Sequence, residues 1–164
     1  YGGEFDNTKW FDQKTLPYAA RSRVMATLAR EGFCRELEPL PGAIAGVKAL
    51  MAAGCEVHFV TSLWSSPTWA YDRQRWLQGY GLLDGYSRLV FAKDKYVVKG
   101  DIFVDDKISN VEKWQEAWPN GLGIVWAQPW NTDWTGLPAR RFNDWSRLLS
   151  MAAIMKEKQE SYGL

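Results

Sequence analysis

The chain has 164 residues, which is enough for one domain with a buried core. Its 20 basic and 19 acidic residues leave a formal net charge of +1, so we expect neither a nucleic-acid partner nor binding to a membrane surface. No apolar run reaches the length of a membrane span, and no signal peptide is expected. The two cysteines, Cys34 and Cys55, lack metal-ligand spacing, which predicts a reduced cytoplasmic protein.

Helical and strand patterns alternate along the chain. Helices are expected over residues 17–30, 68–79, 109–118 and 142–157, with another between Gly42 and Gly54, and strands over 55–61, 89–91, 101–104 and 122–126. Ser109 and Glu112 predict a capping box at the start of their helix. The one histidine, His58, is expected on a strand facing a helix layer, and a Ser–His–Asp mechanism is not expected. The alternation predicts an α/β fold, with a Rossmann-like parallel sheet and helices on both faces.

A pair of acidic residues ends one of these strands. The apolar run Ile102-Phe103-Val104 leads directly into Asp105 and Asp106. Adjacent carboxylates repel each other unless a cation or a proton lies between them. Mg²⁺ is the natural candidate, because it is a hard ion that takes oxygen ligands. The alternative is an ordinary acidic turn after a strand.

Other polar residues follow other expected strands. Thr61 and Ser62 follow the strand over 55–61, and Lys95 follows the strand over 89–91. The hydroxyls suit an anion, and the ammonium group suits a phosphate oxygen. Common polar turns are the alternative in each case. Asn131 lies after the last strand, in a loop that could close over a ligand.

Hydroxyl, lysine and double aspartate on successive strand ends resemble motifs II, III and IV of the haloacid-dehalogenase-type phosphatases. The stretch Glu36-Leu37-Glu38-Pro39-Leu40-Pro41-Gly42 adds to the likeness, as do Val60-Thr61-Ser62 and Lys93-Asp94-Lys95. Together with the aspartate pair they resemble the 5′(3′)-deoxyribonucleotidase family, from about Trp10 to about Trp145. The resemblance implies a small helical cap over residues 1–35 and a core over 36–164.

The resemblance also implies a reaction. Family members hydrolyse nucleoside monophosphates through an aspartyl-phosphate with the help of Mg²⁺, and they are often homodimers. Carried over, Thr61 and Ser62 would bind the phosphoryl oxygens, Lys95 would neutralise charge, and Asp105 and Asp106 would hold the metal. The candidates for contact with the rest of the substrate are aromatic residues and one amide: Trp10, Phe11, Phe33, Trp64 and Asn131. For Trp10, Phe11 and Phe33, packing inside the cap is the alternative.

One family motif is absent from these 164 residues. The first motif, Asp-x-Asp-Gly-Val, carries the nucleophile and the general acid at the end of the central strand. Its nearest imitation, Glu4-Phe5-Asp6-Asn7-Thr8, lacks the second aspartate and the preceding apolar run. The strands that end at Thr61 and Asp105 should flank that central strand. We therefore expect either an added strand or an open gap between them, and direct pairing of the two would contradict the assignment.

Three explanations of the absent motif are open. The chain begins with Tyr1 rather than Met, so preceding residues could carry the motif. A separate chain could supply the strand, or the protein could be a remnant without catalysis. We favour the first because the other motifs are intact. The rival function is a catalytically inactive nucleotide- or protein-binding module, and a third is a phosphatase for another small phosphomonoester.

Overall fold

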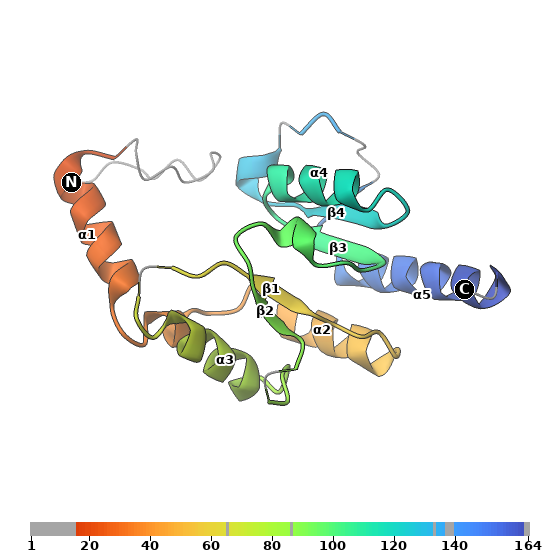
Figure 1. Cartoon of the computed structure of the whole chain (residues 1–164), viewed down its shortest axis with the longest axis horizontal. Coiled ribbons are helices and arrows are strands. Elements are labelled where there is room, and N and C mark those ends of the chain that lie inside the picture. The colour runs from red at the N-terminus through yellow and green to blue at the C-terminus, as the bar shows by residue number, and fades with distance from the viewer. Residues whose placement is uncertain (1–15, 65, 86, 133, 137–139, 163–164) are drawn as a thin grey trace.

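The computed structural model describes residues 16–64, 66–85, 87–132, 134–136 and 140–162, and shows an α/β fold with two small parallel sheets (Figure 1). The helices are α1 (Tyr18–Ala29), α2 (Ala43–Ala52), α3 (Trp69–Gly79), α4 (Ile108–Ala117) and α5 (Trp145–Tyr162). The strands are β1 (Phe59–Thr61), β2 (Leu89–Phe91), β3 (Ile102–Asp105), β4 (Leu122–Trp126) and β5 (Arg141–Phe142). Short 3₁₀ turns are η2 (Phe33–Glu36), η3 (Lys95–Val97) and η4 (Pro129–Asn131). The predicted α/β class with parallel strands is confirmed.

The larger sheet has the order β3-β4-β5, and its strands bury alternate side chains on opposite faces. On one face, Phe103 packs with Val111 and Trp114 of α4, and the Phe103 and Trp114 rings stack with centroids 5.3 Å apart. On the other face, Ile124 packs with Leu148 of α5. Helices therefore cover both faces of this sheet, as the sequence predicts.

The smaller sheet pairs β1 with β2 in parallel, with Val60 opposite Val90. Helices α2 and α3 pack against it. Leu77 of α3 is buried in a cluster that also takes in Val47 of α2 and Phe59 of β1. This cluster is separate from the two clusters that line the larger sheet.

Helices α2 and α5 pack against each other and so connect the smaller sheet with the larger one. The indole ring of Trp145, the first residue of α5, lies against Gly46 in the middle of α2. A Cβ atom on Gly46 would lie 2.2 Å from Cδ2 of Trp145. Only a residue without a side chain allows the helices to approach this closely.

Strand β1 is shorter than the sequence predicts. The expected strand over 55–61 pairs only from Phe59, because β2 offers just three partner residues. His58 precedes the strand, is exposed, and lies with Nε2 3.1 Å from Glu56 Oε1. The prediction that His58 faces a helix layer from within a strand is therefore wrong.

Two other predictions about local structure also differ from what is observed. Helix α4 begins at Ile108 with Lys107 as its N-cap, and Ser109 makes no capping hydrogen bond there. The helix starts earlier because Lys107 O already accepts a hydrogen bond from Asn110 N. The sequence predicts a loop from Pro129 to Arg141 and a helix from Phe142, whereas Pro129–Asn131 form η4, Arg141–Phe142 form β5 by pairing with β4, and α5 begins only at Trp145.

Strands β1 and β3 do not pair with each other within the part of the chain that the structure describes. Each is an edge strand of its own sheet, which is the open gap expected from the sequence. Two neighbouring cavities of about 480 and 380 Å³ lie here, and both are lined by Arg73 and Val104. Phe59, Val60 and other apolar side chains line the smaller one.

Helix α1 stands away from both sheets and packs against η2 (Figure 1). None of its residues is buried. The boundary predicted between a cap and a core at residue 35 stays a prediction. Among the described residues, no helix has the length and apolar character needed to cross a bilayer.

Candidate active site

Asp105 is fixed at the carboxyl end of β3 by three contacts. Its Oδ2 lies 2.5 Å from Lys95 Nζ, while Oδ1 accepts hydrogen bonds from Lys107 N at 2.8 Å and from Asn110 Nδ2 at 3.0 Å. The residue is 8% exposed. Both carboxylate oxygens are therefore engaged with the protein, and Asp105 orients the first turn of α4.

Lys95 reaches Asp105 from the first position of η3, which follows β2. Its side chain is 19% exposed, so the ion pair is only partly screened by water. The structure thus brings together the lysine and the first aspartate of the predicted constellation. Their chemical roles stay predictions.

Asp106 is the less engaged carboxylate of the pair. Burial, and after it the charge of Asp105, raise the pKa of Asp106 above its ordinary value of 3.8. The backbone N–H groups of Asp106 and Lys107 oppose the shift only in part. In the described part of the chain, no Lys, Arg or His forms an ion pair with Asp106. This carboxylate therefore favours a proton or a cation close by.

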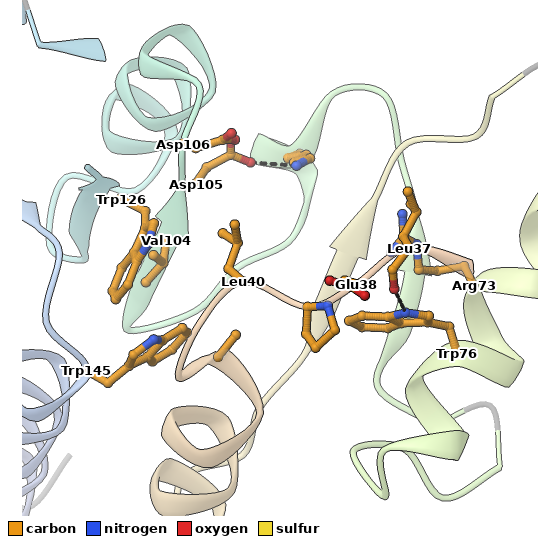
Figure 2. A pocket seen from close by; sticks show the side chains of 13 residues that line it. Leu37, Glu38, Leu40, Arg73, Trp76, Val104, Asp105, Asp106, Trp126 and Trp145 are labelled. Carbon is orange, nitrogen blue, oxygen red and sulfur yellow. Dashed lines mark hydrogen bonds and ion pairs between the residues drawn. The ribbon is translucent and has the colours of Figure 1, made fainter. Parts of the chain in front are cut away.

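A cavity of about 480 Å³ opens in front of the two aspartates (Figure 2). Asp105 and Asp106 lie on one side, where Lys95 pairs with Asp105, and Arg73 and Trp76 of α3 lie on the opposite side. Trp126 and Trp145 line the cavity below the aspartates, with ring centroids 4.4 Å apart. The space thus has charged groups on opposite sides and several apolar side chains between them, as binding sites for small organic molecules often do.

Thr61 and Ser62 lie across the gap from the aspartates. Thr61 ends β1 and lines the smaller cavity. Ser62 is exposed, and its Oγ donates to Ala92 O at 3.2 Å. Both hydroxyls are at the carboxyl edge of their sheet, as predicted, but no contact joins them to Asp105 or Lys95 in the described residues.

The predicted aromatic contacts with substrate are not gathered at the cavity. Phe33 begins η2, and the Arg30 guanidinium lies over its ring, with Cζ 5.8 Å from the ring centroid. Trp64 is 38% exposed and tilts against Trp69 at 6.4 Å. Neither is among the residues that line the two cavities as the structure describes them. Trp10 and Phe11 lie outside the described residues.

Asn131 is buried beside the ends of β3 and β4 and is not among the described residues that line the two cavities. It is 1% exposed, and its Nδ2 donates to Asp106 O at 2.9 Å and to Trp126 O at 2.8 Å. Its Oδ1 accepts from Gln128 N at 2.9 Å and from Arg141 Nε at 3.1 Å. All four hydrogen-bonding positions of the amide are thus used by the protein. The predicted contact of Asn131 with substrate stays untested, and this geometry favours a supporting role.

Two residues of the site were not found from the sequence. Asn110 lies five residues after Asp105, at the start of the following helix, and this spacing could have indicated its hydrogen bond. No sequence pattern indicates that Arg73 lies at this site. Its guanidinium lies 5.7 Å from the Trp69 ring and 5.6 Å from the Trp76 ring, and its buried Nε has no hydrogen-bond partner among the described residues. Only the packing of α3 brings it to the cavity.

The residues present suit Mg²⁺ in part. Within the described residues, no three His, Cys, Asp or Glu side chains gather as a complete metal cluster. Mg²⁺ does not need one, because it commonly binds one or two carboxylates and takes water and phosphate oxygens for the rest. Asp106, a half-buried carboxylate with no ion-pair partner among the described residues, fits that pattern.

The parallel α/β sheet and the polar residues at its carboxyl edge define a phosphatase-type core of the haloacid-dehalogenase kind. The comparison with known families is more specific. The chain belongs to the family described as 5′ nucleotidase, deoxy (pyrimidine), cytosolic type C, whose model matches residues 6–159.

Individual relatives agree with this family. A Bordetella parapertussis protein, provisionally named a 5′(3′)-deoxyribonucleotidase, is 28% identical over 131 residues, which is 79% of this chain and 69% of the relative. The human cytosolic-type 5′(3′)-deoxyribonucleotidase is 28% identical over 144 residues, covering 85% of this chain and 67% of the human protein. The human mitochondrial enzyme is 33% identical over 79 residues, covering 47% of this chain and 35% of that enzyme.

Proposed function

We propose that this protein is a Mg²⁺-dependent phosphatase that hydrolyses deoxynucleoside or nucleoside monophosphates through an aspartyl-phosphate. The observation that carries the proposal is the Lys95–Asp105 ion pair beside the half-buried Asp106, at the sheet edge of a chain that belongs to a nucleotidase family. The names of the relatives support the substrate class. The free cysteines and the cytosolic-type relative support a cytoplasmic location.

Phosphoryl transfer needs positioning and charge stabilisation more than covalent machinery. Lys95 is suited to neutralise a phosphate oxygen, because its ammonium group lines the cavity beside the aspartates. Thr61 is suited to donate a hydrogen bond from its hydroxyl group to the same phosphate, from the other side of the gap. Asp105 would act through Lys95, whose ammonium group it holds in place.

Asp106 would hold the Mg²⁺ ion, with Asp105 near enough to act through water. A bound Mg²⁺ ion would supply positive charge to the phosphate oxygens. It would also relieve the repulsion from Asp105, which adds to burial in raising the pKa of Asp106.

The nucleophile would be an aspartate on a strand in the gap between β1 and β3. Both edges that face the gap lack strand partners among the described residues, and apolar side chains line it. Unpaired strand edges are costly when buried, so a strand pairing with both would stabilise the sheet. A carboxylate nucleophile also needs no histidine, in agreement with the exposed position of His58.

The second candidate is a catalytically inactive module that binds a nucleotide or a protein. It is favoured by one observation, the absence of an Asp-x-Asp-Gly-Val motif from the 164 residues. The two candidates share the cavity and differ only in turnover.

The test compares three proteins expressed from the complete reading frame: wild type, Asp106→Asn, and the matched control Asp84→Asn. Asp84 is an exposed aspartate in the loop that follows α3. With Mg²⁺ and deoxynucleoside monophosphates, we expect phosphate release from wild type and from Asp84→Asn. The rate of phosphate release by Asp106→Asn should be at least about 100-fold lower than that of wild type, as is typical when a charge-stabilising group is removed. Nucleotide binding without release from wild type would support the inactive module instead.

A further inference from the structure

Asn131 closes the point at which β3 and β4 separate. The last paired residues of the two strands are Asp105 and Val125. The next residues, Asp106 and Trp126, no longer pair with each other, and both of their carbonyl oxygens accept hydrogen bonds from Asn131 Nδ2. One buried amide therefore takes the place of the next step of the ladder.

The amide is itself held from its other end. Gln128 N and Arg141 Nε donate to Asn131 Oδ1, and Arg141 Nη2 donates to Gln128 O at 3.2 Å. Arg141 belongs to β5, so the network ties the ends of β3, β4 and β5 together. With four hydrogen bonds and 1% exposure, Asn131 has one orientation that leaves no buried polar atom unpaired.

The geometry points to Asn131 as the positioning residue of the candidate metal site. By holding the carbonyl of Asp106, it fixes the peptide that follows β3, and with it the direction in which the Asp106 carboxylate enters the cavity. The same turn carries Lys107 N, which donates to Asp105 Oδ1. This inference rests on the proposed metal-binding role of Asp106. Groups that orient metal ligands commonly affect metal affinity about 10- to 100-fold.

The opposite end of the same sheet offers a matched control. Gln115 of α4 is also an amide that bridges backbone groups, with Oε1 accepting from Gly123 N at 2.9 Å and Nε2 donating to Gly121 O at 3.0 Å. It lies at the amino end of β4, away from the aspartates. A purely structural effect of losing such an amide should therefore appear equally in Gln115→Leu and Asn131→Leu.

The experiment measures Mg²⁺ affinity by calorimetry, and urea unfolding, for wild type, Asn131→Leu, Asn131→Asp and Gln115→Leu. Both leucine variants should unfold at lower urea concentration. Only the Asn131 variants should bind Mg²⁺ more weakly, by about 10- to 100-fold. Asn131→Asp keeps the acceptor oxygens but loses both donors, so it should resemble Asn131→Leu in metal affinity. Wild-type Mg²⁺ affinity in both Asn131 variants would overturn the inference.

Amide hydrogen exchange in metal-free protein separates this inference from the proposed function. We expect faster exchange at Lys107 in Asn131→Leu, and at Gly123 in Gln115→Leu. If wild type binds no Mg²⁺, the proposed metal role fails and the inference fails with it. If wild type binds Mg²⁺ and Lys107 exchanges at the wild-type rate in Asn131→Leu, only the positioning role is overturned.

Discussion

Lys95 Nζ lies 2.5 Å from Asp105 Oδ2, and this ion pair joins the segment after β2 to the end of β3. The two strands belong to different sheets. The contact therefore connects the two halves of the molecule at the edge where the cavity opens (Figure 2).

Lys95→Met should lose catalytic activity and lower the free energy of unfolding by about 1–3 kcal/mol, because it leaves the buried Asp105 carboxylate without its cation. The exposed neighbour Lys93 provides the control, and Lys93→Met should change the free energy of unfolding by less than about 0.5 kcal/mol. Chemical denaturation measures both. Equal effects of the two substitutions would contradict the structural role of the ion pair.

Asp106→Asn should make the metal-free protein more stable at neutral pH while removing Mg²⁺ binding. The pKa of Asp106 is raised in the folded protein, so the folded state holds the proton more tightly than the unfolded chain. Wild-type stability should therefore fall as the pH rises from about 4 through the raised pKa of the folded state. The variant should lack this part of the pH dependence. Thermal unfolding across pH, without metal, measures the difference, and a less stable variant at neutral pH would be the opposite of what burial of the charge predicts.

Mg²⁺ should raise the unfolding temperature of wild type and leave that of Asp106→Asn unchanged. A ligand that binds only the folded state stabilises it by an amount that grows with the logarithm of the ratio of ligand concentration to Kd. Thermal unfolding with increasing Mg²⁺ and with a chelator measures this effect. An equal rise in unfolding temperature in the two proteins would mean that Mg²⁺ binds to ligands other than Asp106.

Gly46→Ala should lower the free energy of unfolding by about 1–3 kcal/mol, because the new methyl group would overlap the Trp145 ring. The gain in helix propensity, roughly 1 kcal/mol, is too small to offset the clash. Gly79→Ala is the matched control, since a Cβ at Gly79 in α3 meets nothing within 4 Å. It should be neutral or stabilising. If both substitutions stabilise the protein, α2 and α5 do not pack as closely as described.

The sequence predicts most of what depends on local pattern. Strand β3 can be predicted because an apolar run stops at the carboxylates of Asp105 and Asp106. Because the strands of each sheet are parallel, Thr61, Lys95 and Asp105 can be predicted to lie at or just after carboxyl ends of strands. Arg73 and the two residues of β5 were not readable. Arg73 meets the cavity only through the packing of α3, and β5 exists only because β4 lies beside it.

The role of Asn131 shows a second limit of the sequence. Its place after the last long strand suggests a loop that closes over a ligand. The structure instead buries the amide between the ends of β3 and β4. A polar residue in a loop can serve the ligand or the backbone, and only the three-dimensional arrangement of strand ends shows which groups need a partner.

On the proposed function, this protein releases phosphate from deoxynucleoside monophosphates with the help of Mg²⁺. The most direct measurement is the rate of inorganic phosphate release by the folded product of the complete reading frame, across a panel of deoxynucleoside monophosphates and other small phosphomonoesters, with Mg²⁺ and with a chelator. We expect phosphate release from at least one deoxynucleoside monophosphate, and we expect the chelator to abolish it. Folded protein that releases no phosphate from any member of the panel would contradict it.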